Sequence, residues 1–321
     1  MRPAQPEIIG VIILQPNVTT SNSPHVPAEV TRQRVACDLC GGQESEPFCP
    51  ENGRGLVRCL NCGLVYVGLQ PEAAELYALY GETYFHNNDS GEVGYTNYVK
   101  DEHNIRKTFA FRLKRLEKWV NPGKALDVGC AAGFFLDVAH QHGWQVQGMD
   151  VSNFAVEYVR QRFGYDARLG SLTDLDYPEN SYDLITMWDV IEHVPSPKVY
   201  VEKIAKLLKR GGVVALATPN VDSPVAKITG KNWMGYKLSE EHVYYFSVKT
   251  LRRLLEEAGF EVVDTRHVGK YVTMRLFIDR LEMYLPPLAK LGGLIERVFK
   301  LSRRSFYVNP FDIVAVTARK R

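Results

Sequence analysis

The sequence predicts an α/β fold built on a doubly wound, mostly parallel sheet, together with a small N-terminal unit. Two observations support this prediction. Apolar strands alternate with amphipathic helices from about residue 104 onward, and a turn of small residues links the first of these strands to its helix. A chain of 321 residues has room for one large domain and a small second one.

The stretch KALDVGCAAGFF (124–135) is an apolar strand that runs into small residues and then into a helix. Because Gly129, Ala131 and Gly133 have little or no side chain, a charged cofactor can approach the turn, and the helix adds N–H groups. The spacing differs from the dinucleotide pattern G-x-G-x-x-G, and it places Asp127 two residues before the first glycine. A carboxylate there repels pyrophosphate. The turn therefore favours S-adenosylmethionine (SAM), which carries a cationic sulfonium and an amino-acid moiety.

An amphipathic helix is expected over 104–120, because apolar side chains recur there at steps of three and four residues. Further helices are expected at 153–164, 197–212 and 248–260, and strands at 144–150, 165–170, 182–188, 213–219 and 261–267. Repeated strand–helix units of this length form a parallel sheet whose ligands bind outside the carboxyl ends of the strands.

Asp150 ends the second of these strands, about twenty residues after the turn. At this place a carboxylate can accept hydrogen bonds from both ribose hydroxyls of a nucleotide cofactor. A simpler role is to help cap the helix that follows Ser152, and the two roles are compatible.

Four cysteines near the N-terminus form two C-x-x-C pairs, each followed by glycine: Cys37, Cys40, Cys59 and Cys62. Four thiolates at this spacing can surround one Zn²⁺ tetrahedrally, so residues 35–70 are predicted to form a zinc ribbon. Cys49 and Cys130 lack a pairing pattern and are expected to be plain small residues. With no export signal evident, this use of cysteine favours a reducing, cytoplasmic compartment.

Residues 1–34 contain five prolines and are expected to form an irregular arm, apart from an apolar stretch at 8–14 that suits one short strand. That stretch is far shorter than the ~20 residues needed to span a membrane. The net charge of +2 provides no marked basic excess, which argues against nucleic acid as a partner.

The linker at 71–103 is rich in aromatic residues. It contains Tyr77, Tyr80, Tyr84, Phe85, Tyr95 and Tyr98. Such a segment either closes over a cofactor as a lid or forms an apolar interface between two domains, and the sequence leaves both interpretations open.

Taken together, these stretches resemble the class I SAM-dependent methyltransferases over residues 105–268. LDVGCAAGFF matches their first motif, GMDVS the acid after their second strand, SLTDLDYPENSYDLITMWDVIEHV their third- and fourth-strand region, and LKRGGVVALATPN their fifth strand. The resemblance implies a SAM-binding domain over 104–321. It also implies a Rossmann-like sheet of seven strands whose last strand, here FDIVAVTARKR, is antiparallel.

The resemblance further implies which residues bind the cofactor: Asp127, Gly129, Ala131, Gly133, Asp150, Ser171, Leu172, Trp188 and Asp189. Two residues depart from the family pattern. Ala131 stands where many members have a second glycine, and Ser171 where many have an aspartate that reaches the adenine amino group. The backbone of Leu172 can still contact the adenine.

The stretch WDVIEHV places Asp189, Glu192 and His193 together after the fourth strand. If the acceptor is a hydroxyl, a base must take its proton, and His193 with a near-neutral pKa is the first candidate. The stretch also resembles the E-x-x-E-H segment of the ubiquinone-biosynthesis O-methyltransferases, where carboxylates and a histidine hold a divalent ion. These three residues are thus a candidate second metal site. A structural cap of the next helix is the simpler role for His193.

A second E-H pair, Glu241 and His242, precedes a helix whose expected N-cap is Ser247. The segment resembles E-H-x-x-x-F-[ST] in methyltransferases of polysaccharide and antibiotic-sugar biosynthesis, many of which carry an N-terminal four-cysteine zinc domain. His242 is therefore a rival base, or a loop residue that only forms hydrogen bonds. The favoured function is methyl transfer to a hydroxyl of a sugar, glycan or related metabolite. The alternatives are a zinc-ribbon RNA methyltransferase and a non-catalytic binding module.

The short hairpin that the family has before its last strand is expanded here into a helical insertion at about 270–309. Between 275 and 304 its apolar residues alternate with basic ones. Such a segment can cover the acceptor, form a homodimer contact, or rest on a membrane surface as a peripheral contact. A cover or a dimer contact is favoured over the membrane.

Overall fold

The structure is a computed structural model that describes residues 32–49, 55–80, 99–237, 241–282, 285–299 and 304–321. The short strand expected at 8–14 and four of the six linker aromatics, Tyr84, Phe85, Tyr95 and Tyr98, lie outside the described residues. The chain from Thr31 onward forms one unit. Within the described residues, no helix has the length and apolar character that crossing a membrane requires.

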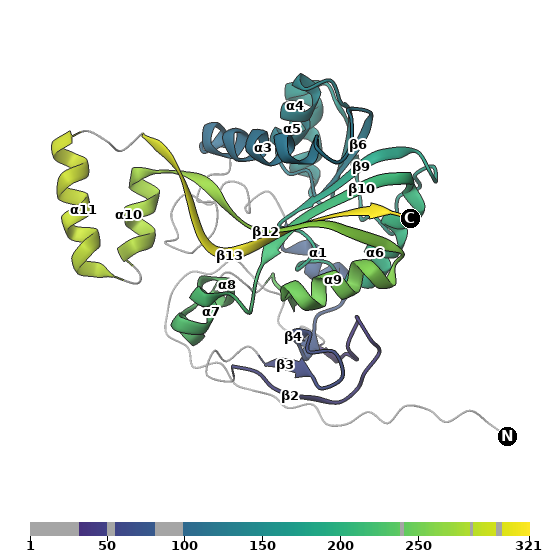
Figure 1. Cartoon of the computed structure of the whole chain (residues 1–321), viewed down its shortest axis with the longest axis horizontal. Helices are drawn as coiled ribbons and strands as arrows, with labels where there is room; N and C mark the ends of the chain where they lie inside the picture. Colours follow the sequence, from purple (N-terminus) through teal and green to yellow (C-terminus); the bar gives the residue numbers. More distant parts are fainter. Residues whose placement is uncertain (1–31, 50–54, 81–98, 238–240, 283–284, 300–303) are drawn as a thin grey trace. The chain divides into compact units, whose positions relative to one another are not determined.

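A seven-stranded sheet forms the centre of this unit (Figure 1). In spatial order its strands are β12 (Phe260–Thr273), β13 (Ser305–Lys320), β10 (Leu208–Pro219), β9 (Tyr182–Trp188), β6 (Lys124–Val128), β7 (Gln145–Asp150) and β8 (Asp166–Leu169). Only β13 runs antiparallel to its neighbours. The predicted Rossmann-like α/β fold with an antiparallel last strand is therefore confirmed. The strand order reverses at β6, where ligands of such sheets bind.

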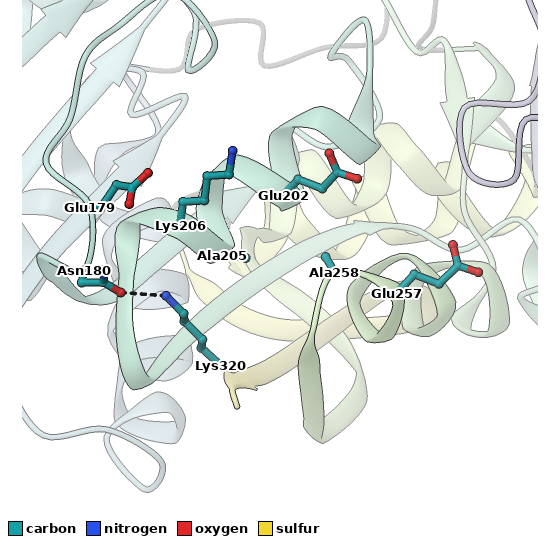
Figure 2. A pocket seen from close by; sticks show the side chains of 8 residues that line it. All are labelled: Glu179, Asn180, Glu202, Ala205, Lys206, Glu257, Ala258 and Lys320. Atoms are coloured by element: carbon teal, nitrogen blue, oxygen red, sulfur yellow. Dashed lines mark hydrogen bonds between the residues drawn. The ribbon is translucent and has the colours of Figure 1, made fainter.

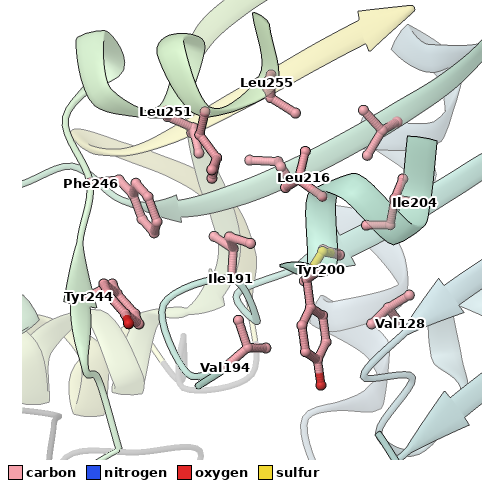
Figure 3. Close-up of a cluster of buried hydrophobic side chains, with 14 of the residues drawn as sticks. Val128, Ile191, Val194, Tyr200, Ile204, Leu216, Tyr244, Phe246, Leu251 and Leu255 are labelled. Carbon is pink, nitrogen blue, oxygen red and sulfur yellow. The ribbon is translucent and has the colours of Figure 1, made fainter. Parts of the chain in front are cut away.

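Helices cover both faces of the sheet (Figure 1). One face carries α3 (Glu102–Leu116), α4 (Phe134–Gln141) and α5 (Asn153–Phe163), and the other carries α6 (Pro197–Leu207) and α9 (Val248–Glu257). Ser247 is an N-cap as predicted, and Ser152 and Ser196 are two more; each Oγ accepts a backbone N–H three residues later. Figure 3 shows the apolar contact between α6, α9 and the sheet, with Ile204, Leu251 and Leu255 packed around Leu216.

Several predicted boundaries differ from the structure: the helix expected at 104–120 ends at Leu116 and the one expected at 248–260 ends at Glu257, and two further differences are larger. The helix expected at 197–212 ends at Leu207, because Leu208 is extended (φ −69°, ψ 142°) and already begins β10. The strand expected at 261–267 continues to Thr273, paired with β13 along its length. The helical insertion therefore consists of α10 (Met274–Glu282) and α11 (Pro286–Phe299), joined to the sheet through these two strands.

A second sheet contains the cysteine pairs. Its order is β11 (Tyr244–Tyr245), β4 (Val65–Val67), β3 (Leu56–Cys59) and β2 (Ser45–Pro47). Because β11 comes from the segment after His242, the ribbon is extended by a strand from the large domain. The remaining elements are β1 (Gln33–Arg34), β5 (Leu69–Gln70), α1 (Ala73–Ala78), α7 (Pro224–Thr229), the 3₁₀ helix η2 (Gly230–Asn232) and α8 (Met234–Lys237).

Candidate functional site

The turn after β6 is shaped by the packing of the protein itself. Gly129 and Gly133 have φ values of +74°, and Ala131 has a φ of +45°. A Cβ at Gly129 would lie 2.6 Å from Val190 Cγ2, and one at Gly133 would lie 2.7 Å from Val159 Cγ2. Glycine is therefore required at both places by backbone conformation and by close neighbours, in addition to any approach of a cofactor. Ala131 adopts a left-handed conformation that favours glycine.

Asp127 faces the interior of the sheet. Its Oδ1 accepts a hydrogen bond from Thr186 Oγ1 of the neighbouring β9 at 2.6 Å, and only 3% of the residue is exposed. Burial raises the pKa of this carboxyl well above its ordinary value, although the Thr186 hydroxyl opposes the shift. The carboxyl thus connects β6 to β9.

Asp150 joins the end of β7 to the turn. Its Oδ2 accepts the N–H of Ala131 and its Oδ1 accepts the N–H of Ser152, both at 2.9 Å. Ser152, and not Asp150, is therefore the N-cap of α5, and Asp150 instead holds the backbone of the turn and of this cap residue. Each carboxylate oxygen keeps a further lone pair, so these bonds orient Asp150 without exhausting its capacity to accept ribose hydroxyls.

Ser171 and Leu172 follow β8 and are both buried. Ser171 Oγ donates to Asp174 Oδ2 at 2.7 Å, and the side chain of Asp174 is exposed. A carboxylate is therefore present three residues after the position where the resembling family often has one. Tyr77 lies on the same side, where its hydroxyl bonds to that of Tyr200 at 2.9 Å.

Trp188 ends β9 and packs in an aromatic cluster, tilted against Phe109 and edge-on to Phe135. The guanidinium carbon of Arg112, from α3, lies 5.0 Å from the centre of the Trp188 ring. Arg112 is buried, and its Nε and Nη2 have no hydrogen-bond partner among the described residues; the same holds for Trp188 Nε1. Two buried guanidinium nitrogens without a hydrogen-bond partner are unfavourable, so this position favours a ligand with acceptor oxygens, such as a carboxylate.

Asp189, with a left-handed φ of +56°, points to Lys270 of β12, whose Nζ lies 2.9 Å from Asp189 Oδ2. Burial opposes ionisation of Asp189, but the positive charges of Lys270 and Arg112 keep its pKa below the ordinary value. Asp189 is thus paired with Lys270, and the structure does not bring it together with Glu192 and His193, the other two members of the predicted metal set.

His242 takes the place of Asp189 beside Glu192 and His193. One potential ligand atom from each of these three residues lies within 4.8 Å of the others, and the two imidazole rings are 4.5 Å apart. Glu192 is 1% exposed, and neither of its carboxylate oxygens has a partner of normal hydrogen-bond geometry among the described residues, although the nearby Thr218 hydroxyl slightly opposes the rise of its pKa. Burial, reinforced by the charge of Asp189, raises the pKa of Glu192 to about 8. The two predicted bases thus share one cluster.

His193 is held through its Nδ1. The Tyr80 hydroxyl lies 2.7 Å from this atom and the Glu241 carbonyl oxygen 3.2 Å from it. A carbonyl can only accept, so this contact favours a proton on Nδ1 and leaves Nε2, which lies 3.9 Å from Glu192 Oε1, as the basic atom. Burial lowers the pKa of His193 to about 4, so the expected near-neutral pKa is wrong and the ring is neutral at physiological pH. Ser196, and not His193, caps the next helix.

The four paired cysteines meet in the ribbon. The Sγ atoms of Cys37 and Cys62 are 3.4 Å apart, those of Cys40 and Cys59 are 3.6 Å apart, and all four lie within 4.8 Å of one another. Tetrahedral Zn²⁺ with Zn–S bonds of about 2.3 Å requires sulfurs about 3.8 Å apart. The donor set and its spacing therefore suit zinc.

A charged surface depression lies at the opposite edge of the main sheet, and Figure 2 shows its lining. Its residues precede β9 or come from the ends of α6, α9 and β13: Glu179, Asn180, Glu202, Ala205, Lys206, Glu257, Ala258 and Lys320. Lys320 Nζ donates to Asn180 Oδ1 at 2.9 Å. It contains no predicted site residue.

Sequence reasoning missed Arg112 and Lys270. Arg112 lies in the apolar stripe of α3, where Phe109 and Leu116 are buried. A charged residue at such a core position could have indicated a functional role. Lys270 lies in a strand 81 residues after its partner Asp189, and no local pattern predicts that pairing.

Comparison with known proteins identifies the family of the chain. A model of a methyltransferase domain matches residues 101–265. A probable S-adenosylmethionine-dependent methyltransferase of Mycolicibacterium smegmatis is 33% identical over 44% of this chain and 52% of its own length. The ubiquinone biosynthesis O-methyltransferase of Idiomarina loihiensis is 31% identical over 37% and 49%. The chain thus spans about half the length of these relatives. A solved SAM-dependent methyltransferase from Archaeoglobus fulgidus covers 70% of this chain and 99% of its own, with 18% identity and a TM-score of 0.46.

Proposed function

Because the chain belongs to the methyltransferase-domain family, we propose that it binds SAM at the carboxyl edge of the sheet and methylates a small molecule. The observation that carries this proposal is the junction of Asp150 with the turn at Ala131, which places a buried carboxylate beside a strand-to-helix turn. Gly129 and Gly133 shape the backbone of that turn, and Ser171 and Leu172 line the adenine side. The test is a calorimetric titration with SAM, followed by a mass-shift screen of SAM with sugar nucleotides, glycans and phenols.

Arg112 completes the proposed cofactor site. SAM carries an α-carboxylate, and the unpaired, buried guanidinium beside Trp188 offers it two N–H donors. Asp189, whose pKa stays below its ordinary value, supplies negative charge near the ammonium and sulfonium groups. Asp127 holds β6 to β9 beneath the turn. At the other end, the exposed carboxylate of Asp174 substitutes for the adenine-binding aspartate that the family has at the position of Ser171.

The proposed acceptor is a hydroxyl of a sugar, glycan or related metabolite. Its oxygen attacks the methyl carbon as the bond from that carbon to sulfur breaks, and its proton passes to an imidazole. His193 is preferred as base because its Nδ1 contacts leave Nε2 unprotonated and its ring neutral. His242, 4.5 Å away between ring centres, is the rival base.

Glu192, His193 and His242 also form a donor set for a divalent cation, which is a second candidate role. Two imidazoles and a buried carboxylate without a partner suit a transition metal. Equilibrium dialysis with Mn²⁺ distinguishes the roles: stoichiometric binding that Glu192→Gln abolishes supports the metal, and its absence leaves the histidines as base and partner.

The ribbon is proposed to hold one structural Zn²⁺ through Cys37, Cys40, Cys59 and Cys62, since four thiolates leave no position for water. A role of the ribbon in gripping RNA is the competing function. RNA binding with a steep salt dependence would support it, and absence of SAM binding would support a non-catalytic module. The small net charge of +2 favours a small-molecule acceptor over RNA.

A further inference from the structure

The four-cysteine ribbon is connected to the acceptor side of the site through its strand β4. Val67 of β4 donates its N–H to the carbonyl of Val243 at 2.9 Å, and Tyr66 pairs with Tyr244 in β11. The N–H of Val243 in turn donates to the carbonyl of Glu192 at 2.9 Å. Val243 follows His242 directly. One residue therefore connects the ribbon backbone to both loops that carry histidines.

Asp38 forms a second connection. It lies between Cys37 and Cys40, and its Oδ1 accepts the Ser196 hydroxyl at 2.6 Å while its Oδ2 accepts the N–H of Lys198 at 2.8 Å. Ser196 caps α6, three residues after His193. A carboxylate at a helix N-terminus satisfies a free N–H and interacts favourably with the helix dipole. The first cysteine pair thus holds the end of the loop that begins at Asp189.

Apolar contacts reinforce both connections. Leu39, Leu64 and Tyr66 of the ribbon belong to the same buried cluster as Ile191, Val194 and Tyr244. Figure 3 shows Tyr244 and Phe246 facing Ile191 and Val194 across this cluster. The Tyr244 hydroxyl also donates to the Pro195 carbonyl at 3.0 Å.

The cofactor side is held differently. Asp150 and the turn are fixed by β6 and β7, through the N–H groups of Ala131 and Ser152 and the bonds of Gly129 and Cys130 to the Met149 carbonyl. Every partner in this set lies on the large domain. The two halves of the site therefore depend on different parts of the chain.

We propose that the ribbon positions the acceptor side of the active site: Asp38 and β4 fix the loops 189–196 and 241–246, which carry His193 and His242. Asp38 is a positioning residue in this view. The role of these loops in positioning an acceptor rests on the proposed methyl transfer, whereas the structural coupling of the ribbon to the loops does not. Loss of the ribbon metal would loosen these loops and leave the SAM site intact.

The test is hydrogen–deuterium exchange of the zinc-loaded full chain with Asp38→Ala, Asp38→Asn and the control Glu46→Gln. Glu46 is an exposed carboxylate of β2, which lies at the opposite edge of the ribbon sheet from β11. In Asp38→Ala, peptides covering 189–196 and 241–246 should exchange about tenfold faster, because charge-assisted bonds are lost. Asp38→Asn keeps one carbonyl oxygen as acceptor and should show a smaller effect. Glu46→Gln should match the wild type.

Peptides covering 125–133 and 147–152, and the SAM affinity by calorimetry, should stay unchanged in every variant. Removal of zinc with a chelator should reproduce the exchange pattern of Asp38→Ala. If Asp38→Ala fails to fold, Ser196→Ala replaces it, because it removes the hydroxyl that donates to Asp38. Unchanged exchange at 241–246 after zinc removal, or an equal increase at 125–133, overturns the proposal. If the variants and the zinc-free protein show the predicted exchange but the wild type binds no SAM, the proposed function is refuted and the coupling stands.

Discussion

Asp150 has two tasks in this structure, and its substitution should reveal both. Asp150→Ala removes the acceptor for two backbone N–H groups and two proposed ribose bonds. We expect SAM binding to weaken by ~2–3 kcal/mol, at ~1–1.5 kcal/mol for each charge-assisted bond, with an additional loss of unfolding free energy of ~1–3 kcal/mol. Calorimetry and urea unfolding measure the two effects separately. Glu179→Ala, at the opposite edge of the sheet, is the control; wild-type SAM affinity in Asp150→Ala would exclude this turn as the cofactor site.

Arg112 allows a matched test of the amino-acid end of the cofactor. Arg112→Lys keeps the charge but loses the planar pair of donors, and Arg112→Met loses both. We expect SAM affinity to fall in the order wild type, Lys, Met, with a loss of ~2 kcal/mol or more for Met. Methylthioadenosine lacks the amino-acid moiety, so its affinity should not change. A parallel loss for both ligands would contradict a carboxylate contact.

The proton acceptor is tested by His193→Ala and His242→Ala. Removal of a general base lowers the rate typically 10²–10⁴-fold, and SAM affinity should be unaffected because the base acts on the acceptor. Tyr80→Phe, which removes the hydroxyl near Nδ1, should give a smaller loss. With an acceptor in hand, turnover near wild type in both histidine variants and in the double variant rejects this mechanism.

Local sequence patterns located the residues whose partners are close along the chain. The turn, Asp150 and the Ser247 cap follow from spacing and propensity within a few residues. Local patterns could not predict that His242, and not Asp189, lies with Glu192 and His193. This arrangement depends on Lys270 in a distant strand and on the loop before β11.

Among the elements, the ribbon gives the clearest prediction. Purified protein should contain about one zinc per chain, and Cys59→Ser should lose the metal and melt at a lower temperature, because structural zinc sites contribute folding free energy directly. Cys49→Ser, outside the cluster, is the control. A Cys59→Ser protein with full zinc and an unchanged melting curve would contradict a four-thiolate site.

The cysteine pattern predicted the ribbon but not its attachment to the large domain. The pairing of Tyr66 with Tyr244 joins segments far apart in sequence, and β11 is only two residues long. Such a strand has no periodicity to detect. Similarly, α6 ends at Leu207 because the backbone of Leu208 is extended. The apolar spacing of residues 197–207 does not indicate this end, since it would allow the helix to continue.

On the scale of the whole molecule, the α10–α11 hairpin remains to be explained by function. The described contacts of α10 are mainly with α11 and with the adjoining β12. Leu285, Leu288 and Leu294 are about half or more exposed, at 48%, 53% and 61%. Arg275 pairs with Asp279 and lies 3.9 Å from Glu296, so part of the basic charge is balanced within the hairpin. This balance weakens the case for an anionic membrane surface and favours a second copy of the chain as partner.

We therefore expect the protein to form a dimer in solution through this hairpin. Replacing Leu288 and Leu294 together by aspartate should shift the equilibrium to monomer, because each buried leucine contributes roughly 1.5–3 kcal/mol to an apolar contact. Sedimentation equilibrium measures the shift. Ile228→Asp is the control, since Ile228 is 84% exposed on α7, outside the hairpin. A wild type that stays monomeric at high concentration contradicts the dimer. Flotation of that monomer with anionic vesicles, lost in the double aspartate variant, would instead assign the hairpin to a membrane surface.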